Sequence, residues 1–214
     1  PLLARLKLPG RVFQLPSKGL FYEADVLAST VRDGEIQVSP MSALAELKLK
    51  SADLLYSGKV INEICRECAP EILRPEKLVS KDVDALFTFF ALTTYGPEKR
   101  IRDRHSCENA IWHDYTVDLD EIVSHPNNDS LDRRDFLYQV TLENRQIVHL
   151  HPVIFEQSIE ITQKRQALLK RIEGGAQLSV ADQETLFIED TLAVISSVED
   201  KAIDGSTIIV TDKK

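Results

Sequence analysis

The chain has 214 residues, with 34 acidic and 26 basic side chains, so its formal net charge is −8. This charge repels a phosphate backbone and disfavours nucleic-acid binding. No apolar run reaches the roughly 18 to 20 residues that span a bilayer, so we expect no membrane insertion. The three cysteines are an odd number without a recognisable signal peptide, which is typical of free thiols in the cytoplasm.

Residues 1–33 combine prolines, glycines and scattered apolar side chains without a helical or strand period. We interpret this segment as an extended arm that orders itself on a partner protein. Its predicted partner-binding residues are Leu2, Leu3, Leu6, Leu8, Val12 and Phe13. We expect deletion of residues 1–13 to leave a folded, soluble protein that no longer joins its partner complex.

The stretch QLPSKGLFY, residues 14–22, predicts a rigid turn. Pro16 fixes its own φ, Gly19 can take a positive φ, and Ser17 can bond the local backbone. The apolar side chains around the turn need a surface that covers them. We expect the turn to anchor the arm to the folded body, through Leu15, Pro16, Ser17, Lys18, Gly19, Phe21 and Tyr22.

Three helices are predicted in the middle of the chain. After the short strand in GEIQVSP, Ser39-Pro40 predicts an N-cap and a first helical residue, with the helix running to about Lys50. The segment 59–68 places its apolar residues on one helical face. Ser80 predicts the cap of a third, strongly apolar helix that ends at Gly96-Pro97.

Two β-hairpins and further helices are predicted after this block. EKRIRDRHSC and IWHDYTVDL flank one turn, and FLYQVTL and IVHLHPV flank Glu143-Asn144-Arg145, with one helical turn in DLDEIVS between the hairpins. VIFEQSIEITQKRQALLKRIEGG has acids early, bases late and a Gly-Gly stop, which predicts a helix. Ser179 with Asp182 predicts a second C-terminal helix to about Asp200.

The sequence therefore predicts an α+β fold with an N-terminal extended arm, a helical block near 40–96, two β-hairpins near 98–151 and two C-terminal helices. The expected organisation is an arm and turn (1–33), a single α+β domain (34–200) and a C-terminal tail or edge strand (201–214).

Cysteine and histidine residues give two candidate sites. Cys65 and Cys68 form a CxxC near the end of a helix, on its apolar face, whereas redox pairs lie at helix N-termini, so the spacing favours buried structural thiols. Histidines also occur at several positions in the predicted strands, which leaves open a small metal-dependent enzyme with an incomplete ligand set. The residues of that alternative site are His105, Cys107, His149 and His151.

The sequence contains no nucleophile elbow, P-loop or dinucleotide-binding glycine motif. We therefore predict no enzymatic activity, no catalytic or metal-ligating residues and no cofactor.

Arg100, Arg102 and Arg104 alternate along a predicted strand, which places them on one sheet face. One interpretation is a solvated edge strand that charge protects from aggregation. The other is a partner-binding stripe for an acidic protein, because arginine is enriched at interfaces.

Several segments together resemble the baseplate hub family of T-even-type contractile-tailed bacteriophages, which includes a hub subunit and a hub assembly catalyst. They are the LPSKG-LFY turn, the GEIQVSPMSALAE strand and helix entry, the helix ending in LTTYGP, and the Cys-bearing hairpin that follows, over roughly residues 14–125. Many relatives carry Cys-x-x-Cys in this hairpin, where this chain has Cys107-Glu-Asn-Ala110, so a metal-stabilised knuckle is not expected.

The resemblance implies a non-enzymatic structural or chaperone-like protein for assembly of the central baseplate hub. Its expected partners are other phage baseplate hub or tail proteins. Its expected location is the host cytoplasm during assembly, and the resemblance leaves open whether it stays in the tail baseplate of the virion. A cytoplasmic adaptor unrelated to phages is a further alternative.

Overall fold

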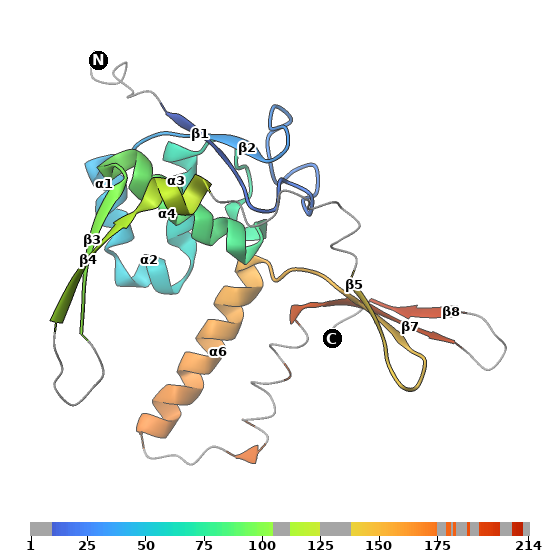
Figure 1. Cartoon of the computed structure of the whole chain (residues 1–214). Coiled ribbons are helices and arrows are strands. Elements are labelled where there is room, and N and C mark those ends of the chain that lie inside the picture. The colour runs from blue at the N-terminus through green and yellow to red at the C-terminus, as the bar shows by residue number, and fades with distance from the viewer. Residues whose placement is uncertain are drawn as a thin grey trace.

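The computed structural model describes residues 10–104, 112–124, 138–174, 179–180, 182, 188, 193–201 and 207–211. Within these residues the chain is an α+β protein, which confirms the predicted fold class (Figure 1). The helices are α1 (Ala43–Leu49), α2 (Ala52–Tyr56), α3 (Lys59–Cys68), the 3-10 helix η2 (Pro75–Lys77), α4 (Ser80–Tyr95), α5 (Leu119–Ser124) and α6 (Phe155–Glu173). The strands are β1 (Arg11–Gln14), β2 (Glu35–Val38), β3 (Glu98–Arg104), β4 (Trp112–Asp118), β5 (Tyr138–Thr141), β6 (Ile147–Leu150), β7 (Ile195–Lys201) and β8 (Thr207–Val210).

The hydrophobic core lies where the β1–β2 ribbon packs on α3 and α4. β1 and β2 pair antiparallel, with Phe13 opposite Ile36, and both side chains are buried. The ring of Phe13 stacks on that of Phe89 in α4, with centroids 4.4 Å apart. The buried face of α3 consists of the residues that its helical period predicts, Val60, Ile61, Ile64, Cys65 and Cys68.

Residues 10–33 are part of this folded unit. The prediction of an extended arm over residues 1–33 is therefore wrong for this segment, which contains strand β1 and the buried side chains of Leu15 and Val26. The four residues of β1 are too few to show a strand period, and their pairing partner lies more than 20 residues away in sequence. Residues 1–9 lie outside the described residues.

Two helices do not begin where predicted: α1 begins later, and α4 begins one residue earlier. The N-cap of α1 is Ser42, whose hydroxyl accepts a hydrogen bond from the Ala45 N–H over 3.2 Å, so the helix does not begin at Ser39-Pro40. The N-cap of α4 is Val79, and Ser80 is the first helical residue. The Ser80 N–H donates to the carbonyl of Val153, which holds this entry to the helix in an extended conformation.

The C-terminal part forms a four-stranded antiparallel sheet in the order β5-β6-β7-β8. The prediction of a helix to about Asp200 is wrong from Ile195 onward, because Ile195–Lys201 is strand β7. Its β-branched residues favour a strand, and β6 offers the edge on which it pairs. The predicted edge strand in the tail is β8, which pairs with β7.

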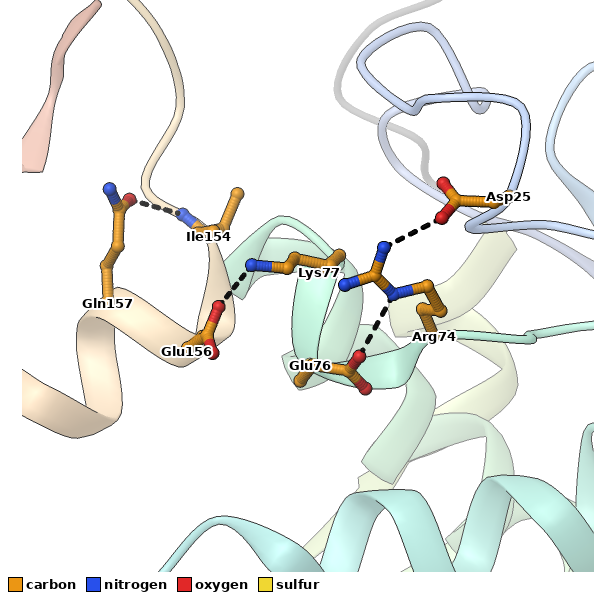
Figure 2. Close-up of polar contacts among 7 residues, drawn as sticks. All are labelled: Asp25, Arg74, Glu76, Lys77, Ile154, Glu156 and Gln157. Carbon is orange, nitrogen blue, oxygen red and sulfur yellow. Dashed lines mark hydrogen bonds and ion pairs between the residues drawn. The ribbon is translucent and has the colours of Figure 1, made fainter.

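The start of α6 is joined to the chain between η2 and α4. Val79 and Ile154 form an antiparallel bridge, and the Phe155 N–H donates to the carbonyl of Leu78 over 2.7 Å. Figure 2 shows that Lys77 forms an ion pair with Glu156 at this joint. From here α6 runs away from the helical block, while the β3–β4 hairpin projects on the side opposite the C-terminal sheet (Figure 1).

Nearby, Arg74 pairs with both Asp25 and Glu76, over 2.7 and 3.2 Å (Figure 2). Arg74 lies two residues after Ile72, which forms an antiparallel bridge with Leu27. The ion pairs therefore link the loop after the anchoring turn to the η2 segment. Because these side chains are substantially exposed, solvent screens both pairs and we expect them to contribute little to stability.

Candidate interaction surface

The turn at residues 15–22 is bonded to α4 through one buried carboxylate, that of Asp82. The Ser17 N–H donates to Asp82 Oδ1 over 2.9 Å, and the Ser17 hydroxyl donates to Oδ2. The Tyr22 hydroxyl donates to the same Oδ2 over 2.6 Å and accepts from the Val79 N–H over 3.0 Å. Asp82 is fully buried, so these contacts fix the turn on the first turn of α4.

The backbone of this turn has the conformation that its glycine predicts. Lys18 and Gly19 have φ values of 52° and 74°, and the Gly19 N–H donates to the Ser17 hydroxyl over 3.1 Å. The Leu15 N–H donates to the carbonyl of Gly34 over 2.9 Å. Gly34 itself has a φ of 69°, and a Cβ atom there would lie 2.7 Å from the Lys18 carbonyl carbon. The turn and the segment before β2 are therefore in backbone contact.

Burial controls the protonation of this network. Desolvation raises the pKa of Asp82, and the hydrogen bonds from Ser17 and Tyr22 oppose this shift without cancelling it. Burial, followed by the nearby Asp82, also raises the pKa of Tyr22. The phenol therefore remains a neutral donor throughout the physiological pH range.

The predicted partner-binding residues of the arm that the structure describes, Val12 and Phe13, differ in solvent exposure. Val12 is 66% exposed on β1, whereas Phe13 is only 4% exposed and belongs to the core. The assignment of Phe13 to a partner interface is therefore wrong, because Phe89 already covers its ring. Leu2, Leu3, Leu6 and Leu8 lie outside the described residues.

The β3–β4 hairpin is open to solvent on both faces. Its seven cross-strand pairs run from Glu98 opposite Asp118 to Arg104 opposite Trp112. Every residue of β3 is exposed, and in β4 only Val117 is partly covered. The hairpin emerges from a fixed base, since the Leu119 N–H donates to the carbonyl of Pro97 over 2.8 Å and Leu119 packs against the core.

One face of the hairpin carries the three arginines. Arg100, Arg102 and Arg104 occupy alternate positions of β3 and lie across from Thr116, Asp114 and Trp112. Arg102 pairs with Asp114 over 3.6 Å, and its guanidinium carbon lies 5.4 Å from the centre of the Trp112 ring.

The other face of the hairpin is apolar at its centre. Ile101 lies directly opposite Tyr115, and these side chains are 45% and 52% exposed. On the arginine face, Trp112 is 54% exposed. The arginine stripe does not point to these three apolar side chains. The alternation of apolar residues in IWHDYTVDL is a signal for Tyr115 alone, since Trp112 is out of phase with it and Ile101 lies on the other strand.

The predicted histidine site is not assembled by the described residues. His149 bonds through Nε2 to Glu199 Oε1 over 2.8 Å and through Nδ1 to Gln139 over 3.3 Å. His151 Nδ1 instead donates to the carbonyl of Pro152 over 2.7 Å. Across the described part of the chain, no three His, Cys, Asp or Glu side chains form a metal-binding group. His105 and Cys107 lie outside the described residues.

The thiol groups of Cys65 and Cys68 lie on the buried face of α3. Burial raises the pKa of the Cys65 thiol, and the neighbouring Cys68 adds to this effect. A reactive cysteine needs a lowered pKa and access to solvent. Both thiols are buried, and the pKa of Cys65 is raised, so the pair contributes to core packing.

Comparison of the chain with protein families, curated proteins and solved structures gave no match. Among the described residues, no helix combines the length and the apolar character required to cross a membrane.

Proposed function

We propose that this chain is a non-enzymatic structural or chaperone-like protein that acts through protein–protein contacts during assembly of the central baseplate hub of a contractile phage tail. The observation that carries the proposal is the exposed β3–β4 hairpin, with Trp112, Ile101 and Tyr115 on its two faces. A two-stranded hairpin is only marginally stable in water by itself. Exposed aromatic and apolar side chains on such an element are suited to burial against another subunit.

The assignment to a baseplate hub derives from the resemblance over residues 14–125. That region includes the anchoring turn, α4 and the hairpin, which are connected in space. Asp82 holds the turn at the start of α4, and the hairpin leaves from the end of the same helix at Gly96. A rigid helix that carries a fixed hairpin suits a protein that sets the position of neighbouring subunits.

The proposed partners are other baseplate hub or tail proteins of the same phage, bound in the host cytoplasm during assembly or retained in the virion baseplate. Arginine and tryptophan are common among the residues that dominate binding energy at interfaces. The stacked pair of Arg102 and Trp112 and the exposed pair of Ile101 and Tyr115 therefore form the proposed contact surface.

The test is co-expression with baseplate hub proteins of a T-even-type phage, followed by purification of the assembled complex. We expect Trp112→Ala and Tyr115→Ser to reduce incorporation strongly while leaving the thermal midpoint within a few degrees of wild type. Leu44→Ser is the matched control, because Leu44 is a large exposed apolar residue outside the hairpin. Wild-type incorporation of both hairpin variants would contradict the proposal.

A further inference from the structure

The two strands of the hairpin each have an open outer edge. Among the described residues, β3 and β4 form a two-stranded sheet, so each strand pairs on one side only. The outer edge of each strand is therefore open to a further strand, with one donor of β3 already used, because the Arg104 N–H donates to Asp103 Oδ1 over 2.8 Å.

Charge distinguishes the two edges of the arginine face. Three arginines and one acid, Glu98 at the start of the strand, lie along β3, whereas Asp114 and Asp118 lie along β4. Beyond Glu98, a segment that approaches β3 meets guanidinium groups, and one that approaches β4 meets carboxylates. The edge of β3 is thus the one that selects an acidic partner.

The arginines of β3 differ in their neighbours across the hairpin. Arg102 pairs with Asp114, but Arg100 and Arg104 lie opposite the uncharged residues Thr116 and Trp112. Within the described part of the chain, neither of these two guanidinium groups has an ion-pair partner. Two positive charges remain for an external carboxylate, at positions about 13 Å apart along the strand.

We propose that the edge of β3 accepts an extended, acidic segment of a different protein as a third strand, with carboxylates beside Arg100 and Arg104. Main-chain hydrogen bonds to β3 supply affinity, and two acidic side chains four positions apart supply selectivity. This inference rests on the proposed function and names the chemistry of the partner.

Trp112 provides a local probe, because it is the single tryptophan of the chain and its ring lies beneath the guanidinium group of Arg102. A strand added on β3 changes the surroundings of Arg102 and therefore the emission of Trp112. The measurement needs no label on the protein.

The experiment titrates the full chain with a short synthetic peptide of alternating threonine and valine that carries two glutamates four positions apart. We expect a saturable change in Trp112 emission, together with slowed amide exchange in residues 98–104. A peptide with lysine in place of both glutamates should not bind. A peptide that keeps the glutamates but is N-methylated at alternate backbone positions should also fail, because it cannot pair as a strand.

Two variants of the chain complete the test. Arg100→Glu with Arg104→Glu should weaken peptide binding by about tenfold or more, and Arg100→Gln with Arg104→Gln by less. Circular dichroism checks that both variants are folded. Equal binding of the N-methylated peptide, or exchange protection confined to 112–118, would overturn the inference.

The outcomes separate this inference from the proposed function. If the charge-reversed chain fails to enter the hub complex but the wild-type chain does not bind the acidic peptide, strand addition is wrong and the assembly role stands. If sedimentation shows self-association that the charge reversal abolishes, the occupant is a second copy and the inference of a different protein is overturned.

Discussion

The hydroxyl of Tyr22 donates a hydrogen bond to the carboxylate of Asp82 over 2.6 Å and so connects the N-terminal turn with α4. Ser17 contributes two further donors to the same carboxylate. A buried carboxylate with several donors stabilises a fold mainly because the donors are costly to leave unpaired. The network therefore fixes the position of the whole turn.

Replacement of the acceptor should be more damaging than replacement of one donor. We expect Asp82→Ala to lower the free energy of unfolding by about 3 kcal/mol or more, because two buried donors of Ser17 and the partly buried Tyr22 hydroxyl lose their acceptor. Tyr22→Phe should cost about 1 to 2 kcal/mol, through the lost bond and the unpaired Val79 N–H. Urea denaturation measures both values. Equal costs would show that the carboxylate is not the centre of the network.

The same carboxyl group predicts a dependence of stability on pH. Its pKa is raised by burial, so its contribution to stability is complete below the ordinary pKa of about 4 and falls as pH rises through the raised value. The free energy of unfolding of the wild type should therefore fall relative to that of Asp82→Asn as pH rises above about 4. Paired urea titrations at a series of pH values measure this difference, in which the carboxylates common to both proteins cancel. If the free energy of unfolding of the wild type instead rises relative to that of Asp82→Asn as pH rises, Asp82 has a lowered pKa.

Gly34 and Gly19 form a matched pair of positive-φ glycines. Gly19→Ala should cost about 1 kcal/mol, since its φ of 74° is unfavourable for alanine but a Cβ atom there would make only ordinary van der Waals contacts, at 3.5 Å or more. Gly34→Ala should cost about 3 kcal/mol, because its Cβ also collides with the backbone of Lys18. Thermal and urea denaturation of the two variants test the backbone contact between turn and ribbon, and similar costs would argue against it.

Phe13 determines how much of the N-terminal segment can be removed. Phe13→Ala should destabilise the chain by about 4 kcal/mol, because a stacked core ring is lost, whereas Val12→Ala should change stability by less than about 0.5 kcal/mol. Deletion of residues 1–13 should therefore cause a large loss of stability or unfolding. Circular dichroism and urea denaturation compare the three chains. Retention of wild-type stability after this deletion would restore the interpretation of residues 11–13 as a free arm.

Local patterns predict much of this fold. The apolar period of α3, the Gly96-Pro97 stop of α4, both hairpins and the helix α6 follow from signals within a few neighbouring residues. These elements form as predicted because packing reinforces what the local sequence already favours.

Features that depend on distant partners are not predictable in this way. Asp82 is a suitable first-turn acid for the helix dipole, and only the folded chain shows that Ser17 and Tyr22 cover it. The Ser179–Asp182 cap signal forms locally, but strand β7 follows because β6 offers it an edge. Ile101 and Tyr115 lie opposite each other because of the register of the hairpin, and the sequence of one strand does not determine that register.

The start of α4 has a consequence for biosynthesis. Three parts of the chain meet there: Tyr22 bonds to the Val79 N–H, while Ser80 and Leu78 bond to the chain around Ile154. The first connection needs only the N-terminal half of the polypeptide, but the second cannot close until residue 155 has left the ribosome. The helical block is thus able to form during translation. The segment around Ile154 then binds to the start of α4, which is already folded.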